Sequence, residues 1–248
     1  MKHALLLAAA LFCAGGVPGQ AVREQSPLYH GPVTQVQGVF VTPISGVPFS
    51  ATVVIESKQP LPDGTVETRH TQTLIARDSR GRIRNERHVM VADSFRGVPP
   101  LLSVHTFDPA TRISYFFNPA THIAEQLIVP EPRTPTVPRD ANNEDLGYTT
   151  LNGMQAKGTR VTRTIPAAMS GTGKPVQVVD EFWYSEDLHM DLLERHTDMR
   201  GGVQTVAILS IQRDEPEPSL FELPEGYKVI DITPPAVAPI LRGSGTNP

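Results

Sequence analysis

Residues 102–129, LSVHTFDPATRISYFFNPATHIAEQLIV, contain one word twice at a spacing of ten residues. The two copies read Phe-Asp-Pro-Ala-Thr-Arg-Ile and Phe-Asn-Pro-Ala-Thr-His-Ile. An Asp or Asn side chain starts a type I turn by accepting a backbone N–H, and the proline that follows presets φ. The segment therefore predicts two tight turns, at Asp108 and Asn118, joining three strands at 102–107, 112–117 and 122–129.

Short β-branched runs separated by Pro and Gly turns continue on both sides of this meander. The expected strands are 49–57, 65–76, 82–91, two within 145–165, 176–184, 188–197, 203–212 and 227–232. Asn152-Gly153 is a favoured tight-turn pair, and Pro218 to Phe221 predicts one helical turn. No window after the first 20 residues has sustained helical apolar spacing. We therefore predict a mainly β fold with little helix, a strongly curved antiparallel sheet or half-open β-barrel of about eleven strands.

Proline and glycine, 24 and 19 of 248 residues, also mark the expected domain layout. Residues 129–138 (VPEPRTPTVP) hold four prolines and cannot form a central strand or a helix interior, so 129–140 is expected to be a surface loop. The predicted layout is a signal peptide at 1–21, an irregular lead-in at 22–45, one β domain at 46–232 and a disordered tail at 233–248.

The first residues predict export from the cytoplasm. Lys2 and His3 precede an apolar run, Ala4 to Ala14, which is too short for a membrane span and ends in a Gly-Pro-Gly region with small residues. This is typical of a cleaved secretory signal, so we expect a periplasmic or extracellular protein with no transmembrane segment in the mature chain. The one cysteine, Cys13, falls inside this leader, which predicts a mature domain without disulfides.

Charge and motif content exclude several function classes. A net charge of −4 without a Lys/Arg block argues against nucleic-acid partners. Gly171-Thr172-Gly173-Lys174 lacks the spacing of a phosphate loop and is interpreted as a plain turn. The strand alternation that we expect places His189 and Asp191 on one side and the remaining acidic and imidazole groups on the other, spread too widely for one metal. That remaining set is Glu194, His196 and Asp198.

Aromatic side chains are the remaining functional signal. They are distributed over many of the predicted strands, and most of them are expected in the core. A curved sheet without enough helix to cover it can leave part of an apolar concave face as a ligand groove. The candidate ligand-binding residues on that face are Phe107, Tyr115, Phe117, Phe182 and Tyr184. No catalytic residue, metal site or cofactor is predicted.

Three stretches of the second half, 181–185 (EFWYS), 196–202 (HTDMRGG) and 220–227 (LFELPEGY), resemble a family of secreted bacterial proteins of unassigned function over about residues 144–230. The chain is more distantly similar to the periplasmic lipoprotein-carrier superfamily of the LolA, LolB and RseB type. There a Trp-bearing strand, a turn, a returning strand and a closing Phe-x-x-Pro-x-Gly-Tyr segment recur. The resemblance implies a half-open β-barrel around a short helical plug, with an apolar cavity for acyl chains and no catalysis. This sequence departs from that pattern because it lacks an amphipathic helix for the plug.

The sequence therefore predicts a non-catalytic periplasmic or secreted binding protein that holds an acyl chain, an apolar peptide or another apolar ligand on a concave sheet. One alternative is an envelope sensor or interaction module that binds a protein partner through a sheet edge or the proline-rich loop. A second alternative is a metal-dependent hydrolase that uses His189 or His196.

Overall fold

The structure, a computed structural model, describes residues 41–130 and 142–234. The first range contains β1 (Phe49–Pro60), β2 (Val66–Arg77), β3 (Ile83–His88), β4 (Val91–Ala92), β5 (Leu101–Asp108), β6 (Ile113–Asn118) and β7 (Ile123–Ile128). The second contains β8 (Asn142–Leu151), β9 (Met154–Ile165), α1 (Ala167–Ser170), β10 (Val176–Ser185), β11 (Met190–Asp198), β12 (Gly202–Gln212), the 3-10 helix η1 (Pro218–Phe221) and β13 (Lys228–Asp231).

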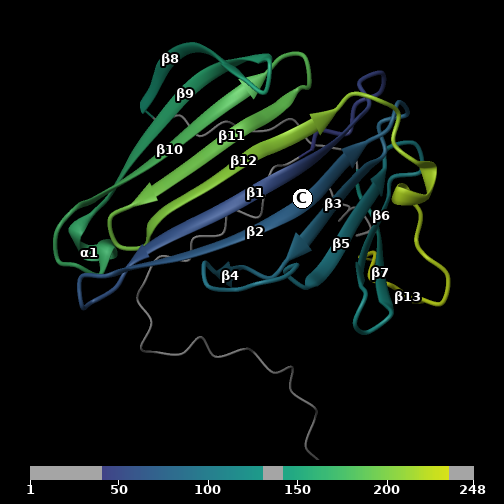
Figure 1. The fold of residues 1–248 in the computed structure, drawn as a ribbon, viewed down its shortest axis with the longest axis horizontal. Helices are drawn as coiled ribbons and strands as arrows, with labels where there is room; N and C mark the ends of the chain where they lie inside the picture. Colours follow the sequence, from purple (N-terminus) through teal and green to yellow (C-terminus); the bar gives the residue numbers. More distant parts are fainter. Residues whose placement is uncertain (1–40, 131–141, 235–248) are drawn as a thin grey trace, which may run out of the picture. The chain divides into compact units, whose positions relative to one another are not determined.

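Within the described ranges all thirteen strands belong to one curved sheet that is not closed (Figure 1). The order is β13-β7-β6-β5-β3-β2-β1-β12-β11-β10-β9-β8, with β4 beside β2, so β8 and β13 form the two edges. Every pairing is antiparallel except that of β13 with β7, which is parallel. The expected mainly β, strongly curved antiparallel sheet is confirmed. The parallel edge strand is a feature that the turn pattern did not predict.

The two copies of the repeated word fold into the same turn. The side chains of Asp108 and Asn118 each accept a backbone N–H two residues on, at 2.8 Å in both turns. Each turn ends in a residue with positive φ, 61° at Arg112 and 53° at His122. The left-handed residue is the last of a four-residue loop, so its side chain does not follow the alternation of the adjoining strands. The predicted tight turns are confirmed, and their register fixes which residues of β5, β6 and β7 are neighbours.

The main core lies on one face of the sheet, which we call the core face. Phe49 and Val53 of β1 are fully buried there, together with Val206 of β12. Its other buried members are Val41, Ala51, Ile75, Ile83, Met154, Ala156, Leu188, Met190, Leu192 and Ile208. Most of these come from β1, β2, β9, β11 and β12, and β3 contributes only Ile83.

Arg77 is the one charged side chain that is fully enclosed in this core among the described residues. Its guanidinium donates to the backbone oxygens of Thr42, Val47 and Leu188 at 2.8–2.9 Å, and it lies 5.0 Å from the ring centre of Phe49. Burial lowers its pKa to about 10, so it stays charged near neutral pH. Three carbonyls from distant segments are therefore tied to one cation.

A smaller cluster occupies the opposite face of β5, β6 and β7. Val104, Phe117 and Ala124 are buried there, each being the register partner of the next. Leu223 and Tyr227 of the segment after η1 pack against them, and Tyr227 meets Phe117 edge to face with ring centres 5.3 Å apart. The C-terminal segment thus covers one face of this part of the sheet.

Local deviations from the predicted elements have identifiable causes. β11 begins at Met190 rather than at 188 because His189 has a left-handed φ of 52°. Val41, in the expected irregular lead-in, is fully buried in the main core. The predicted signal peptide lies outside the described residues, as do most of the proline-rich loop and nearly all of the tail. The two described helices have four residues each, and neither has the length or apolarity to cross a bilayer.

Candidate functional site

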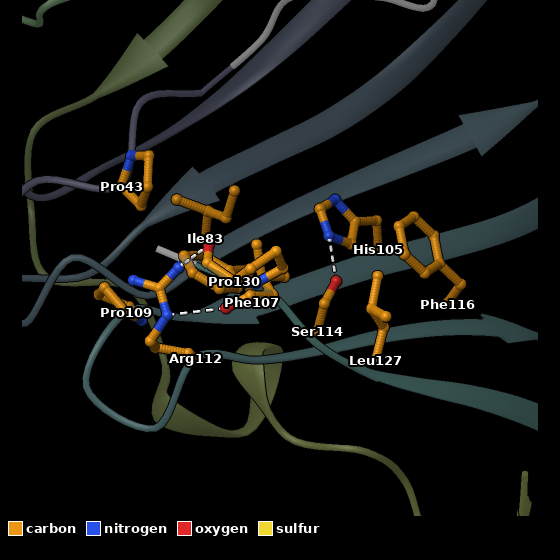
Figure 2. A pocket seen from close by; sticks show the side chains of 11 residues that line it. Pro43, Ile83, His105, Phe107, Pro109, Arg112, Ser114, Phe116, Leu127 and Pro130 are labelled. Carbon is orange, nitrogen blue, oxygen red and sulfur yellow. Dashed lines mark hydrogen bonds between the residues drawn. The ribbon is translucent and has the colours of Figure 1, made fainter. Parts of the chain in front are cut away.

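A cavity of about 590 Å³ opens on the core face of β3, β5, β6 and β7 (Figure 2). Its wall is almost entirely apolar or aromatic. Ring and aliphatic side chains surround three groups with polar atoms, Ser114, His105 and Arg112. The remaining lining residues are Pro43, Ile83, Phe107, Pro109, Phe116, Leu127, Val129 and Pro130.

The register of the repeated turns assembles this wall. Phe107 pairs with Ser114, and Ser114 pairs with Leu127, so one side chain from each of three adjacent strands points to the same face. His105 and Phe116 form the next row. Phe107 and Ile83 also pack against the main core. The cavity is therefore a continuation of the core face over strands where the described chain does not fill it.

His105 enters the wall as a neutral aromatic side chain. Its ring stacks on Phe116 with centres 4.3 Å apart and planes at 5°, and its Nε2 lies 2.8 Å from the Ser114 hydroxyl. Burial lowers the pKa of His105 to about 4. The imidazole is therefore uncharged at physiological pH and contributes a flat, largely apolar surface with one hydrogen bond already made.

Arg112 supplies the one permanent charge among the described residues of the wall. Its backbone sits in the left-handed region at the end of the first turn. From there Nε donates to the Val129 carbonyl at 2.7 Å and Nη2 donates to the Pro130 carbonyl. In residues 41–130 and 142–234 no carboxylate forms an ion pair with this guanidinium.

The five aromatic residues that the sequence singled out do not lie together. Phe107 lines the cavity. Phe117 and Tyr115 belong to the smaller cluster on the opposite face, where the Tyr115 hydroxyl donates to Gln126 at 3.0 Å. Phe182 and Tyr184 lie in β10, half-buried and away from the cavity lining.

Sequence reasoning missed the residues that pair with Phe107 across the strands. Residue type alone does not say on which face of a strand an aromatic side chain lies, and only alternate positions of a strand share a face. The signal was present in the turn, because a four-residue loop between Asp108 and Ile113 sets Phe107 opposite Ser114 and His105 opposite Phe116. Leu127 and Arg112 follow from the same register and the same turn.

The acidic and imidazole groups of β11 are engaged in separate interactions. His196 Nδ1 lies 2.5 Å from Asp180 Oδ1 of β10, and Asp198 accepts from Arg200 at 2.7 Å. Burial, with the nearby Asp191 and Asp180, raises the pKa of Glu194 to about 7. Within the described ranges no group of three or more His, Cys, Asp or Glu side chains could hold a metal ion.

The Gly171–Lys174 stretch connects α1 to β10. The Thr172 hydroxyl forms a hydrogen bond with the Ser170 hydroxyl and donates to the Lys174 carbonyl.

No protein-family model and no curated protein matches the chain, but solved structures do. An uncharacterized conserved protein from Thermus thermophilus is 13% identical over 75% of this chain and 90% of its own, with a TM-score of 0.42. A chain of the MucA/MucB complex of Pseudomonas aeruginosa is 12% identical over 74% of this chain and 58% of its own, with a TM-score of 0.40. A LolA superfamily protein from Nitrosomonas europaea is 12% identical over 71% and 90%, with a TM-score of 0.31.

Proposed function

We propose that this chain is a non-catalytic binding protein that holds an apolar ligand, an acyl chain or an apolar peptide, in the cavity beside Phe107. The observation that carries the proposal is the cavity itself, about 590 Å³ with a nearly continuous apolar wall. Small-molecule sites in proteins commonly have this size and lining, with a few placed polar groups. Exposed apolar surface of this kind is unfavourable in water unless something covers it.

The energetics favour a ligand whose contact with the wall is mainly apolar. Each methylene removed from water contributes about 0.8 kcal/mol, which is about fourfold in affinity. Phe107, Phe116 and Leu127 offer surface for such groups, whereas the hydrogen bond between His105 and Ser114 is already satisfied within the protein. Affinity should therefore rise steadily with chain length until the cavity is full.

The pair formed by Ser114 and His105 is a poor catalytic dyad. A general base works best when its pKa lies near the operating pH, and burial lowers the pKa of His105 to about 4. Among the described residues, no acidic side chain bonds His105 Nδ1 to orient the ring. The geometry supports a polar contact within a binding wall rather than activation of a serine nucleophile.

The sequence at the N-terminus supports a periplasmic or extracellular location for this binding role. The short apolar run after Lys2 and the small residues near Gly19 are typical of a secretory signal. Because an apolar ligand dissolves poorly in water, a protein that carries or holds it is needed in an aqueous compartment of this kind.

Neighbouring residues of β7 provide a matched test. Leu127 lines the cavity, whereas Ile128 is 47% exposed and follows it on the strand. Leu127→Trp should fill the space and weaken binding of a fluorescent C11 fatty-acid probe by about tenfold or more, because the ring takes the volume that the chain needs. Ile128→Trp should leave the affinity within about twofold. Native mass spectrometry of the envelope-purified protein should show a bound lipid or peptide in wild type and not in Leu127→Trp. A wild-type protein that is free of ligand and binds no probe would contradict the proposal.

The sheet edge favours a second candidate function, binding of a protein partner. β8 is an edge strand, and Tyr148 on it is 65% exposed. An edge strand presents unpaired backbone groups to which an extended segment of another protein can add. A photo-crosslinking amino acid at Tyr148 should capture one defined envelope protein. The same probe at Leu209, 55% exposed within β12, is the control and should not capture it.

A further inference from the structure

The cavity wall has few ionisable side chains among its described residues. Of the described residues that line it, only Arg112 and His105 have ionisable side chains, and none is a carboxylate. Burial lowers the pKa of His105 to about 4, so it is neutral near pH 7. The described part of the wall therefore has a single positive charge in an otherwise apolar surface.

Arg112 is held in place by neutral groups. Its Nε and Nη2 donate to the carbonyls of Val129 and Pro130, which fix the guanidinium but do not cancel its charge. Guanidinium has five N–H donors, so several remain for another acceptor. Asp108, the acidic residue of the same turn, accepts from the Ala110 N–H and lines a different cavity with Arg82 and Phe221.

We infer that the ligand is an amphiphile with one anionic head group, which binds at Arg112 while its apolar chain lies along Phe107 and Leu127 toward Phe116. The inference rests on the proposed function and specifies its ligand class. Figure 2 shows Arg112 at one end of the cavity and the stacked His105 and Phe116 at the other, with Phe107 between them. The polar and apolar ends of such a molecule therefore each have a matching part of the wall.

Electrostatics distinguish this ligand from neutral and cationic amphiphiles. A carboxylate or phosphate can accept two parallel N–H bonds from a guanidinium, and such charge-assisted bonds are about twice as strong as neutral ones. A hydroxyl head makes one neutral bond, and an ammonium head is repelled. Because the wall around Arg112 is apolar, the difference is screened less than at an open surface.

The test uses the full protein and four ligands with the same C12 chain, namely laurate, dodecyl phosphate, dodecanol and dodecylammonium, all below their micelle concentrations. Each displaces the uncharged probe N-phenylnaphthylamine at pH 7.5. At least one anion should bind about tenfold more tightly than dodecanol, and dodecylammonium should be the weakest. The ratio of the affinities for laurate and dodecyl phosphate shows whether a carboxylate or a phosphate head group is preferred. The anion advantage should shrink with added salt, while dodecanol affinity should not fall.

Arg112→Gln should remove the anion advantage, so that laurate and dodecyl phosphate bind this variant no more tightly than dodecanol does. The matched control is His122→Gln, which introduces the same residue at the equivalent left-handed position of the second turn, outside the cavity lining. Arg112→Lys should keep part of the advantage because it keeps the charge. Equal affinity of wild type for all four ligands, or an advantage that survives Arg112→Gln, would overturn the anionic head group and leave the proposed function standing. Failure of every ligand and of the probe to bind would instead refute the proposed function.

Discussion

Along β1, β2 and β9 to β12 the chain covers the core face with its own side chains, and Val206 in that part is fully buried. Along β5 to β7 the same face has a cavity, and Phe116 remains 42% exposed. The two parts are continuous, because Ile83 and Phe107 contact both the main core and the cavity. Similar apolar residues thus stabilise the fold at one end and remain available to a ligand at the other. The difference lies in what covers them, since both parts belong to one sheet.

Leucine truncation should show this difference most strongly. Leu192→Ala in the filled part removes a side chain that is 1% exposed, so we expect a loss of about 2–5 kcal/mol in the free energy of unfolding. Leu127→Ala at the cavity removes a side chain that already faces open space, so we expect a loss below about 1 kcal/mol. Urea unfolding at pH 7.5 measures both. Equal losses would mean that the cavity wall is packed as tightly as the core.

Two arginines extend the comparison to polar contacts. Arg77 ties three carbonyls inside the filled part, and Arg112 ties two at the cavity. Arg77→Met should cost about 3 kcal/mol because the three carbonyls remain buried without donors. Arg112→Met should cost about 1 kcal/mol, since water can reach that site. Thermal unfolding of both variants checks the ratio, and a stable Arg77→Met protein would contradict it.

The turns and the strand pattern made most of this fold predictable from sequence. Asp108 and Asn118 define two hairpins, and the tight turn at Asn152 and Gly153 forms with φ of 49° and 76° as its sequence indicates. The parallel pairing of β13 was not predictable, because it depends on Tyr227 packing on Phe117 and His122 from a distant part of the chain. Tertiary contacts of that kind leave no local periodicity in the sequence.

The candidate site was less predictable than the fold. Phe107 was named because it is aromatic, and so were Tyr115 and Phe117, which face the other way. Choosing between them requires the exact register, since a shift of one residue exchanges the two faces. How much of the cavity wall the described residues leave uncovered depends in addition on the packing of other segments, which no single strand specifies.

Acid should destabilise the protein through His105 at the cavity. Its pKa is about 4 in the native state and near 6.5 when unfolded, so the unfolded chain binds a proton first as the pH falls. The free energy of unfolding should therefore drop by about 2 kcal/mol between pH 6.5 and 4. This is less than the full pKa difference would give, because the ring is not fully enclosed. His105→Phe should remove this part of the pH dependence. His122→Phe, exposed in the second turn, is the control that should retain it.

Glu194 in β11, the register partner of Val206, should make stability change with pH in the opposite direction. Burial and the nearby Asp191 and Asp180 raise its pKa to about 7, above the unfolded value near 4.5. The native state then holds a proton that the unfolded chain releases, so stability should fall by about 1–2 kcal/mol as the pH rises from 4.5 to 7. Glu194→Gln should flatten this part of the curve, whereas Glu125→Gln at an exposed position of β7 should not. A Glu194→Gln curve identical to that of wild type would show that the carboxyl is ionised and solvated in the native protein.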